Sequence, residues 1–393
     1  MKILAIETSC DDTGIAILEE KRGKFTVLSN IVSSQQIHAN YGGVFPIMAK
    51  REHQTNLVPV LVHALKQAKL ANPKSKTLNP KQIQTLKKIL EKESGLYQFT
   101  KEFLETYEKP SVDYLAVTHG PGLEPCLWVG VNFAKALSFV WDIPVIPVNH
   151  IEAHIAVNFP EKINGNSKSE ILNPKTTFPA ISLIVSGGHT QLILVKKIGE
   201  YEIIGETRDD AAGECFDKAA RILGLGYPGG PIISKVAEKV DRGRASITLP
   251  RPMMHSKDYD FSFSGLKTSV LYKLRDTKPE IAKSKTFIQE MCFAVQDAIC
   301  DVLIKKTLNA AKDYKAKTII LGGGVSANQE LRERFSYTLD PKTYTLIVPP
   351  RELSTDNGLM IAVAGYFNRT KKIGWQRLSV HPNLRIGKEF GNI

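Results

Sequence analysis

The sequence predicts an α/β fold built from two lobes, and three short segments carry this prediction. Each begins as an apolar, β-forming run and breaks into a turn of small residues: KILAIETSCDDTGIAIL at 2–18, AISLIVSGGHTQLILV at 180–195 and KTIILGGGVSANQELRERF at 317–335. The first two contain a second β run after the turn and are typical of β-hairpins, whereas the third continues into a helix. Two lobes that each open with a hairpin would be an internal duplication of topology, although no sequence repeat is visible.

Between the two hairpins, the pattern continues with further α/β elements. A strand, a loop and a helix are predicted over DYLAVTHGPGLEPCLWVGVNFAKALSF at 113–139, followed by the strand PVIPV and a short helix that starts near VNHIEAH. Residues 72–109 contain eight lysines and five glutamates with apolar spacing that suits one or two amphipathic helices. Residues 161–178 are polar and rich in Asn, Ser, Gly and Pro, which predicts a flexible linker. We therefore expect a first lobe at 1–160 with an insertion at 72–109, the linker, and a second lobe at 179–393.

The bulk composition is that of an ordinary globular protein. A chain of 393 residues, 42% hydrophobic, can bury a large core and favours two domains. The N-terminus shows no signal peptide, and no apolar run approaches the roughly 20 residues that span a bilayer. The five cysteines are scattered without a CxxC pair, which fits reduced thiols and disfavours disulfides or a thiolate zinc site. We expect a cytoplasmic protein without membrane association.

The chain is basic. Its formal net charge of +12 favours a polyanionic partner such as nucleic acid. Judged by charge alone, a basic surface that binds no nucleic acid is an equal alternative to a nucleic-acid-binding protein. For the lysine-rich insertion and the basic tail from Arg369 onward, solvated surface is the simpler interpretation.

Two histidines in VNHIEAH have the spacing of a metal site. His150 and His154 are four residues apart, which places both rings on one face of a helix. In the zinc-peptidase motif HExxH the glutamate directly follows the first histidine and acts as the base. Glu152 instead follows His150 by two residues, about 200° round the helix, so it would point away from a metal. The alternative is that the histidines are simply polar residues at a helix start that Asn149 caps.

A third ligand candidate lies far along the chain, in VPPRELSTDNGLMIAVAGY. Asp356 precedes an apolar helix, beside the capping candidates Ser354 and Thr355. The alternative interpretation is that an aspartate at this position stabilises the helix dipole and binds no ligand. Two histidines and one carboxylate would, however, leave open positions for substrate on Zn(II), Fe(II) or another divalent metal.

The glycine turns suggest a bound nucleotide. Turns at 186–190 and 322–328, together with ETSCDD, offer backbone N–H groups and hydroxyls that could hold an anion. Neither glycine turn has the Walker A lysine, and no dinucleotide fingerprint is present. In GECFDKAARILGLGYPGGP, Asp217 could hydrogen-bond a ribose or a substrate amine, or could form only a surface ion pair with Lys218 or Arg221.

With these motifs in order, the chain resembles the bacterial TsaD family, the tRNA N6-adenosine threonylcarbamoyltransferases formerly described as O-sialoglycoprotein endopeptidases. The resemblance covers nearly the whole chain and rests on KILAIETSCDDTGIAI, GGVFPIMAKREH, GPGLEPCLWVG, PVNHIEAH, LIVSGGHTQLI, GECFDKAARILGLGYPGGP, DFSFSGLKTSV, LGGGVSAN and STDNGLMIA. The insertion at 72–109 is longer than the resemblance leads us to expect, as is the segment at 161–178.

The resemblance implies an ASKHA fold, in which two actin/Hsp70-like (RNase H-like) lobes hold the ligand in a cleft between them. It implies that His150, His154 and Asp356 bind one divalent metal, iron or zinc. It also implies substrate-binding positions in the second lobe and assigns Asp11 as a candidate for proton transfer or for organising the cleft. The substrate-binding positions are Ile184, Val185, Ser186, Gly187, Gly188, Asp217, Gly230 and Asn328.

The implied reaction is the transfer of threonylcarbamoyl from threonylcarbamoyl-AMP to N6 of the adenosine 3′ of the anticodon, with release of AMP. The implied partners are tRNA, a paralogous non-catalytic protein and a small ATPase, and a homodimer is a further possibility. Two alternatives remain at this stage: a metallopeptidase that uses the HxExH motif, and an inactive homologue that only binds partners.

Overall fold

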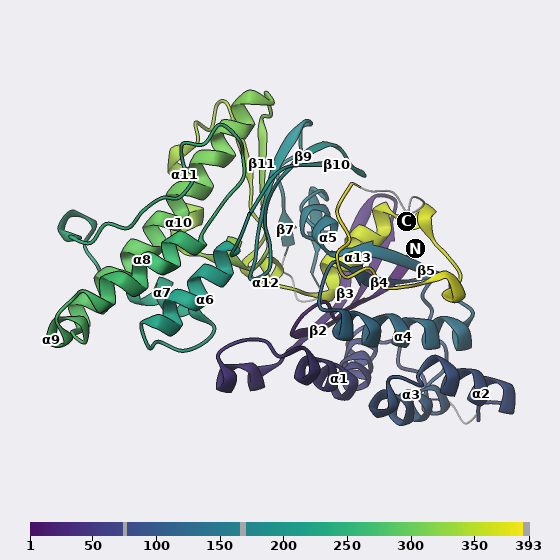
Figure 1. The fold of residues 1–393 in the computed structure, drawn as a ribbon. Coiled ribbons are helices and arrows are strands. Elements are labelled where there is room, and N and C mark those ends of the chain that lie inside the picture. Colours follow the sequence, from purple (N-terminus) through teal and green to yellow (C-terminus); the bar gives the residue numbers. More distant parts are fainter. Residues whose placement is uncertain (74–76, 166–169, 388–393) are drawn as a thin grey trace. The chain divides into compact units, whose positions relative to one another are not determined.

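The computed structural model describes residues 1–73, 77–165 and 170–387, which form two α/β units (Figure 1). The first unit comprises Met1–Gln36, Val44–Asn173 and Asp356–Ile393, and the second comprises Ile37–Gly43 and Pro174–Thr355. The expected cleft between the two lobes stays a prediction.

The first unit is built on a seven-stranded sheet with the order β5-β4-β1-β2-β3-β6-β7. The hairpin predicted at the N-terminus is confirmed, because β1 pairs antiparallel with β2 and places Ile6 opposite Ile15. On the other side of β1, the strand β4 runs parallel, and β5 runs parallel to β4. The strands are β1 (Lys2–Glu7), β2 (Asp12–Lys21), β3 (Lys24–Ser34), β4 (Tyr114–Gly120), β5 (Val145–Asn149), β6 (Lys162–Asn164) and β7 (Glu170–Leu172).

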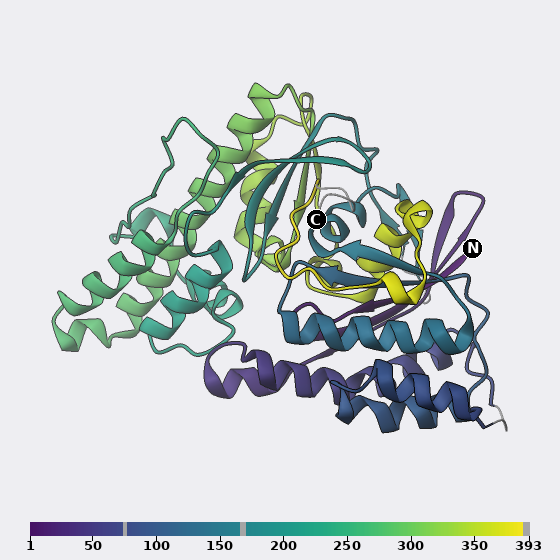
Figure 2. The same cartoon turned by 45° about the vertical axis from the view of Figure 1, so that its right-hand side comes forward.

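Helices cover both faces of this sheet. The helices α1 and α4 pack on one face, with α2 and α3 outside them, as the blue helices of Figure 2 show, and α13 packs on the other face. The amphipathic helices predicted for the insertion are α2 and α3; residues 74–76 of that insertion lie outside the described residues. The helices are α1 (Pro46–Gln67), α2 (Pro80–Ile89), α3 (Ser94–Thr106), α4 (Glu124–Trp141), α5 (His150–Ala156) and α13 (Gly358–Phe367), with the 3-10 turns η1 (Gln36–Tyr41), η4 (Arg369–Lys371) and η5 (Trp375–Arg377).

The second unit repeats the central topology of the first. Its five-stranded sheet has the order β10-β9-β8-β11-β12, in which β8 and β9 form the predicted hairpin and β11 and β12 run parallel to β8. The segment β3-β2-β1-β4-β5 of the first sheet has the same order and the same strand directions. The predicted internal duplication is therefore confirmed. The strands are β8 (Ala180–Val185), β9 (Thr190–Lys197), β10 (Glu200–Glu206), β11 (Thr318–Gly322) and β12 (Thr345–Ile347).

The helices of the second unit form one hydrophobic core with its sheet. Long apolar side chains of α10, such as Met291 and Ile299, are fully buried against the strands and against α6 to α8. The helices are α6 (Ala212–Ile222), α7 (Gly229–Ala237), α8 (Ser264–Arg275), α9 (Pro279–Ala282), α10 (Lys285–Asp313), α11 (Gln329–Thr338) and α12 (Arg351–Ser354), with the 3-10 turns η2 (Arg242–Arg244) and η3 (Gly324–Ala327).

The boundaries differ from the predicted ones at both ends of the second lobe. The predicted linker contains β6 and β7, which extend the first sheet beyond β3; residues 166–169 of it lie outside the described residues. Residues from Asp356 onward belong to the first unit, because α13 is apolar on nearly every side and packs against β1 and β2. Sequence order therefore misplaces the last helix.

Within the described ranges, no helix is long and apolar enough to cross a membrane.

Candidate functional site

The two histidines are presented by a short buried helix that starts directly after a strand. Asn149 ends β5 and caps α5, with its side-chain oxygen accepting from the backbone N–H groups of Ile151 (2.9 Å) and Glu152 (3.1 Å). This cap, predicted from the sequence, fixes the first turn of α5. His150 and His154 then lie one turn apart with ring centroids 4.8 Å from each other, and both are buried.

The third residue of the group is brought to α5 by α13. The Nε2 atoms of His150 and His154 lie 3.5 Å and 3.1 Å from one carboxylate oxygen of Asp356. One ligand atom from each of the three residues can be chosen so that all lie within 4.8 Å of one another. Two imidazole nitrogens and one carboxylate oxygen suit a divalent ion such as Zn(II) or Fe(II), so the donor set fits the expected metal.

Asp356 reaches this position because α13 approaches β2 very closely. Asn357 caps α13 by accepting from the N–H of Met360 at 3.1 Å, a role that the sequence assigned to Ser354 or Thr355. A Cβ atom on Gly358 would lie 2.4 Å from the backbone nitrogen of Ala16. The glycine thus permits backbone contact between helix and strand, and Asp356 sits just before the capped turn.

His150 also contacts residues that sequence reasoning missed. Its Nδ1 atom lies 3.4 Å from a carboxylate oxygen of Glu7 and 3.2 Å from the hydroxyl of Ser9. Burial alone would lower the pKa of His150, but the carboxylates of Asp356 and Glu7 raise it to about 9. A divalent ion and this proton compete for the same ring, so metal binding would release the proton.

Glu152 does not join the group. Among the residues that the structure describes, the only cluster of potential ligands of this kind consists of His150, His154 and Asp356. A peptidase mechanism would need Glu152 beside the metal as a base. The geometry therefore removes the support for the metallopeptidase alternative.

The acidic turn after β1 is held in place by a buried histidine of α1. The Nε2 atom of His53 donates to the carbonyl of Cys10 (2.9 Å), so its Nδ1 atom accepts from the hydroxyl of Thr13 (2.8 Å). Burial and the charge of the neighbouring Asp11, the candidate catalytic residue, raise the pKa of the Cys10 thiol. His53 thus fixes both ends of the turn that carries Asp11 and Asp12.

Asp12, in the same turn, has a perturbed acidity. Burial and the carboxylate of Asp356 raise the pKa of Asp12 to about 7, against the lowering effect of the hydrogen bond with Ser34. A carboxyl group with a pKa near neutral is suited to proton transfer. The sequence-based prediction named Asp11 and did not name Asp12.

In the second unit, the predicted substrate turn joins β8 to β9. The turn is closed by Ser186, whose backbone N–H donates to the carbonyl of His189 (2.8 Å) and whose hydroxyl accepts from the N–H of His189 (3.1 Å). Cβ atoms on Gly187 or Gly188 would meet nothing within 4 Å, so the turn is open. Two further predicted substrate residues, Ile184 and Val185, end the strand β8 directly before this turn. Their side chains are fully buried, so only their backbone groups can contact a ligand.

Asp217 has a structural contact that the sequence did not predict. Its carboxylate accepts from the backbone N–H of Gly229 at 2.7 Å and so ties α6 to the start of α7, which carries Gly230. Lys218 pairs with Asp210 and Glu214 instead of with Asp217.

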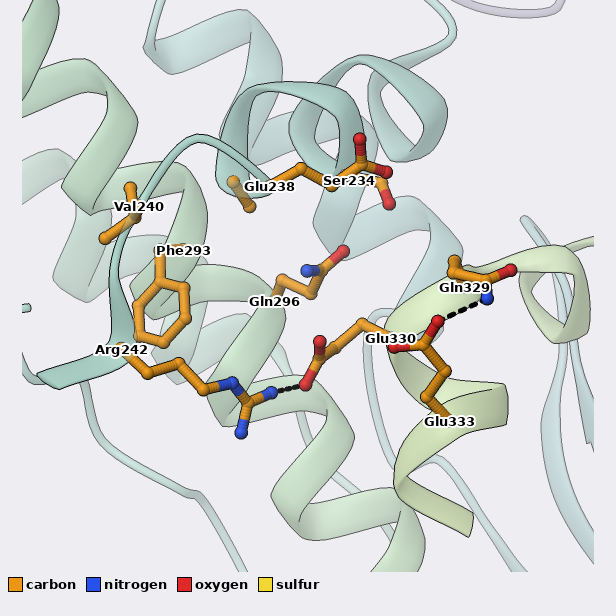
Figure 3. A pocket seen from close by; sticks show the side chains of 10 residues that line it. Ser234, Glu238, Val240, Arg242, Phe293, Gln296, Gln329, Glu330 and Glu333 are labelled. Atoms are coloured by element: carbon orange, nitrogen blue, oxygen red, sulfur yellow. Dashed lines mark hydrogen bonds and ion pairs between the residues drawn. The ribbon is translucent and has the colours of Figure 1, made fainter. Parts of the chain in front are cut away.

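The second unit contains a cavity of about 420 Å³, whose lining includes Gln296 (Figure 3). Asn328 caps α11 by accepting from the N–H of Leu331 (3.0 Å), and its amide donates to Gln296 (2.9 Å), which lines the cavity. This volume is within the roughly 300–1,000 Å³ range of ligand pockets. None of the eight predicted substrate residues lines the cavity itself. Its lining is Ser234, Ala237, Glu238, Val240, Arg242, Phe293, Gln296, Gln329, Glu330 and Glu333.

The repeated sheet order, with a candidate metal-binding group in one unit and an open glycine turn in the other, defines an ASKHA-type protein. The family model of the tRNA N6-adenosine threonylcarbamoyltransferases, TsaD, matches residues 26–76 and 98–363. The chain belongs to this family.

Curated relatives support the same assignment over almost the whole chain. Proteins named tRNA N6-adenosine threonylcarbamoyltransferase from Thermosipho africanus and Thermomicrobium roseum are 41% and 42% identical to this chain, covering 98% of it and 100% and 97% of their own lengths. The protein of that name from Porphyromonas gingivalis is 39% identical, over 93% of this chain and 92% of its own. The family is one of tRNA-modifying acyltransferases, and the peptidase alternative receives no support from it.

Proposed function

We propose that this chain transfers the threonylcarbamoyl group from threonylcarbamoyl-AMP to N6 of the adenosine that follows the anticodon in tRNA. The observation that carries this proposal is the family match, together with the assembled group of His150, His154 and Asp356. In the reaction, a bond forms between N6 and the carbamoyl carbon, the bond from that carbon to the AMP phosphate breaks, and N6 loses a proton.

For the metal, we propose that His150, His154 and Asp356 hold one divalent ion. When bound, such an ion supplies a Lewis acid that stabilises negative charge on a carbonyl oxygen. The proton of N6 would go to the acidic turn, where Asp11 is the sequence candidate. Asp12 is a second candidate acceptor, because burial and the charge of Asp356 raise its pKa toward neutral.

For the nucleotide, we propose that the second unit binds the AMP portion of the substrate. The open turn Ser186-Gly187-Gly188 can offer backbone N–H groups to the phosphate. The cavity lined by Gln296 is large enough for a nucleoside, and the ring of Phe293 in its lining can contact a base. Asp217 would act by holding the start of α7, which carries Gly230.

For the partners and location, the net charge of +12 supports tRNA binding through phosphates rather than through base reading. The free cysteines suit the reducing cytoplasm, where we place the reaction. We propose that a paralogous protein and a small ATPase assist the reaction.

The proposal is tested by a transfer assay with synthetic threonylcarbamoyl-adenylate, unmodified tRNA and the candidate partner proteins, followed by mass spectrometry of the nucleosides. We expect modified adenosine with the parent chain and none with His150→Ala. The variant Glu93→Gln, which changes a buried carboxylate in the α3 region, is the matched control and should retain activity. Absence of product from the parent chain, with metal bound and partners present, would rule out the proposed reaction.

A further inference from the structure

Glu7 has a fully buried carboxylate whose two oxygens have different partners. It is the last residue of β1, and one oxygen accepts from the backbone N–H of Ser9 at 2.5 Å. The other accepts a short hydrogen bond from the hydroxyl of Thr118 on β4 and lies 3.4 Å from Nδ1 of His150. A buried carboxylate is costly unless hydrogen bonds satisfy it, and these donors fix its orientation.

The ring of His150 has two distinct sides. Its Nε2 atom faces Asp356 at 3.5 Å, whereas its Nδ1 atom faces Glu7 and the hydroxyl of Ser9. A nitrogen that binds a metal must be unprotonated, so a metal on Nε2 requires the ring proton on Nδ1. That proton then points at an acceptor that is already in place.

We infer that Glu7 is a positioning residue of the metal site: its carboxylate accepts the Nδ1 proton of His150 and keeps Nε2 aimed at the metal. The inference rests on the metal site proposed above. A carboxylate in this position fixes the tautomer and ring orientation of the ligand and makes its metal-binding nitrogen more basic. Thr118 supports the arrangement by holding Glu7.

The effect should pass through only one of the two histidines. In the part of the chain that the structure describes, the contacts of Glu7 reach His150, whereas His154 contacts the group through its Nε2 atom and Asp356. Loss of the carboxylate should therefore weaken one ligand and leave the other two unchanged.

The test measures the affinity of the full-length chain for Zn(II) by competition with a chromophoric chelator. Loss of an outer-shell carboxylate typically costs about 10–100-fold in metal affinity, and we expect this for Glu7→Gln. The same substitution should have almost no effect in a His150→Ala background and its full effect in a His154→Ala background. A purely structural role for Glu7 would weaken binding equally in both backgrounds and would overturn the inference.

Two further variants keep the result interpretable. Thr118→Val removes the donor that holds Glu7 without changing charge, so it should weaken Zn(II) binding less than Glu7→Gln, and the two losses should not add. Glu93→Gln removes another fully buried carboxylate of the same unit, paired with Lys50 at 3.1 Å, and should leave the affinity unchanged. Zn(II) binding by the parent with unchanged affinity in Glu7→Gln refutes this inference alone, whereas no Zn(II) binding by the parent refutes the metal site as well.

Discussion

Replacement of Gly358 by alanine should destabilise the first unit, because backbone already occupies the position of the new methyl group. The added Cβ would lie 2.4 Å from the nitrogen of Ala16 and 2.7 Å from the carbonyl carbon of Ile15. Ordinary contact begins near 3.4 Å, so α13 and β2 must separate by about 1 Å. No side-chain rotation can relieve a contact with backbone.

We expect Gly358→Ala to lower the free energy of unfolding by about 1–3 kcal/mol, the usual cost of overpacking. A unit of about 200 residues loses roughly 2–4 °C in Tm per kcal/mol, which gives a fall of about 2–12 °C. Zn(II) affinity should fall too, because the same turn positions Asp356.

Differential scanning calorimetry measures this change, with Gly265→Ala as the matched control. Gly265 is near the start of α8, and its added Cβ would meet only Pro252 at 3.9 Å. Alanine there should be neutral or stabilising by up to about 1 kcal/mol. A Gly358→Ala protein whose Tm equals that of the control would show that α13 does not pack as closely on β2 as described.

Three further outcomes are expected. Burial and the charge of His381 lower the pKa of His119 to about 3; because the unfolded chain takes up this proton near pH 6.5, stability should fall as pH decreases from about 6.5 to 3. The variant His119→Asn should flatten that part of the urea-unfolding profile. Removal of metal with a chelator should lower the Tm of the parent, by an amount equivalent to about 2.7 kcal/mol when free metal had been 100-fold above its Kd, and should lower the Tm of His154→Ala, which binds metal more weakly, by less. Arg251→Met breaks contacts with two carboxylates of α10 and should cost about 1–3 kcal/mol in urea unfolding, whereas equal stability would show that the ion pairs contribute nothing.

Local sequence patterns predicted most elements of the fold, because hairpins and capped helices are specified by neighbouring residues. The two hairpins were predicted from their apolar runs and turns, and the cap by Asn149 followed from its place before the histidine helix. The assignment of the last helix to the second lobe was wrong, because the packing of α13 on β1 and β2 depends on contacts between opposite ends of the chain.

The candidate site was predictable only in part, for the same reason. The spacing of His150 and His154 is local, and the structure brings both to Asp356, about 200 residues further on. The sequence did not indicate a role for Glu7 in the site, because a carboxylate at the end of an apolar strand is also typical of the first residue of a loop. Its contact with Thr118 joins positions more than 100 residues apart, which no periodicity of one segment can indicate.

The origin of α13 at the end of the chain also has a consequence for biosynthesis. The second unit is almost continuous, whereas the first needs α13 to cover one face of its sheet and Asp356 to complete the His-His-Asp group. At about 5–20 residues per second, a ribosome takes roughly 10–40 s to proceed from the end of β7 to Asp356. During that interval one face of the nascent first sheet lacks α13, and the proposed metal group lacks Asp356, so a metal ion could bind all three proposed ligands only after α13 has been synthesised.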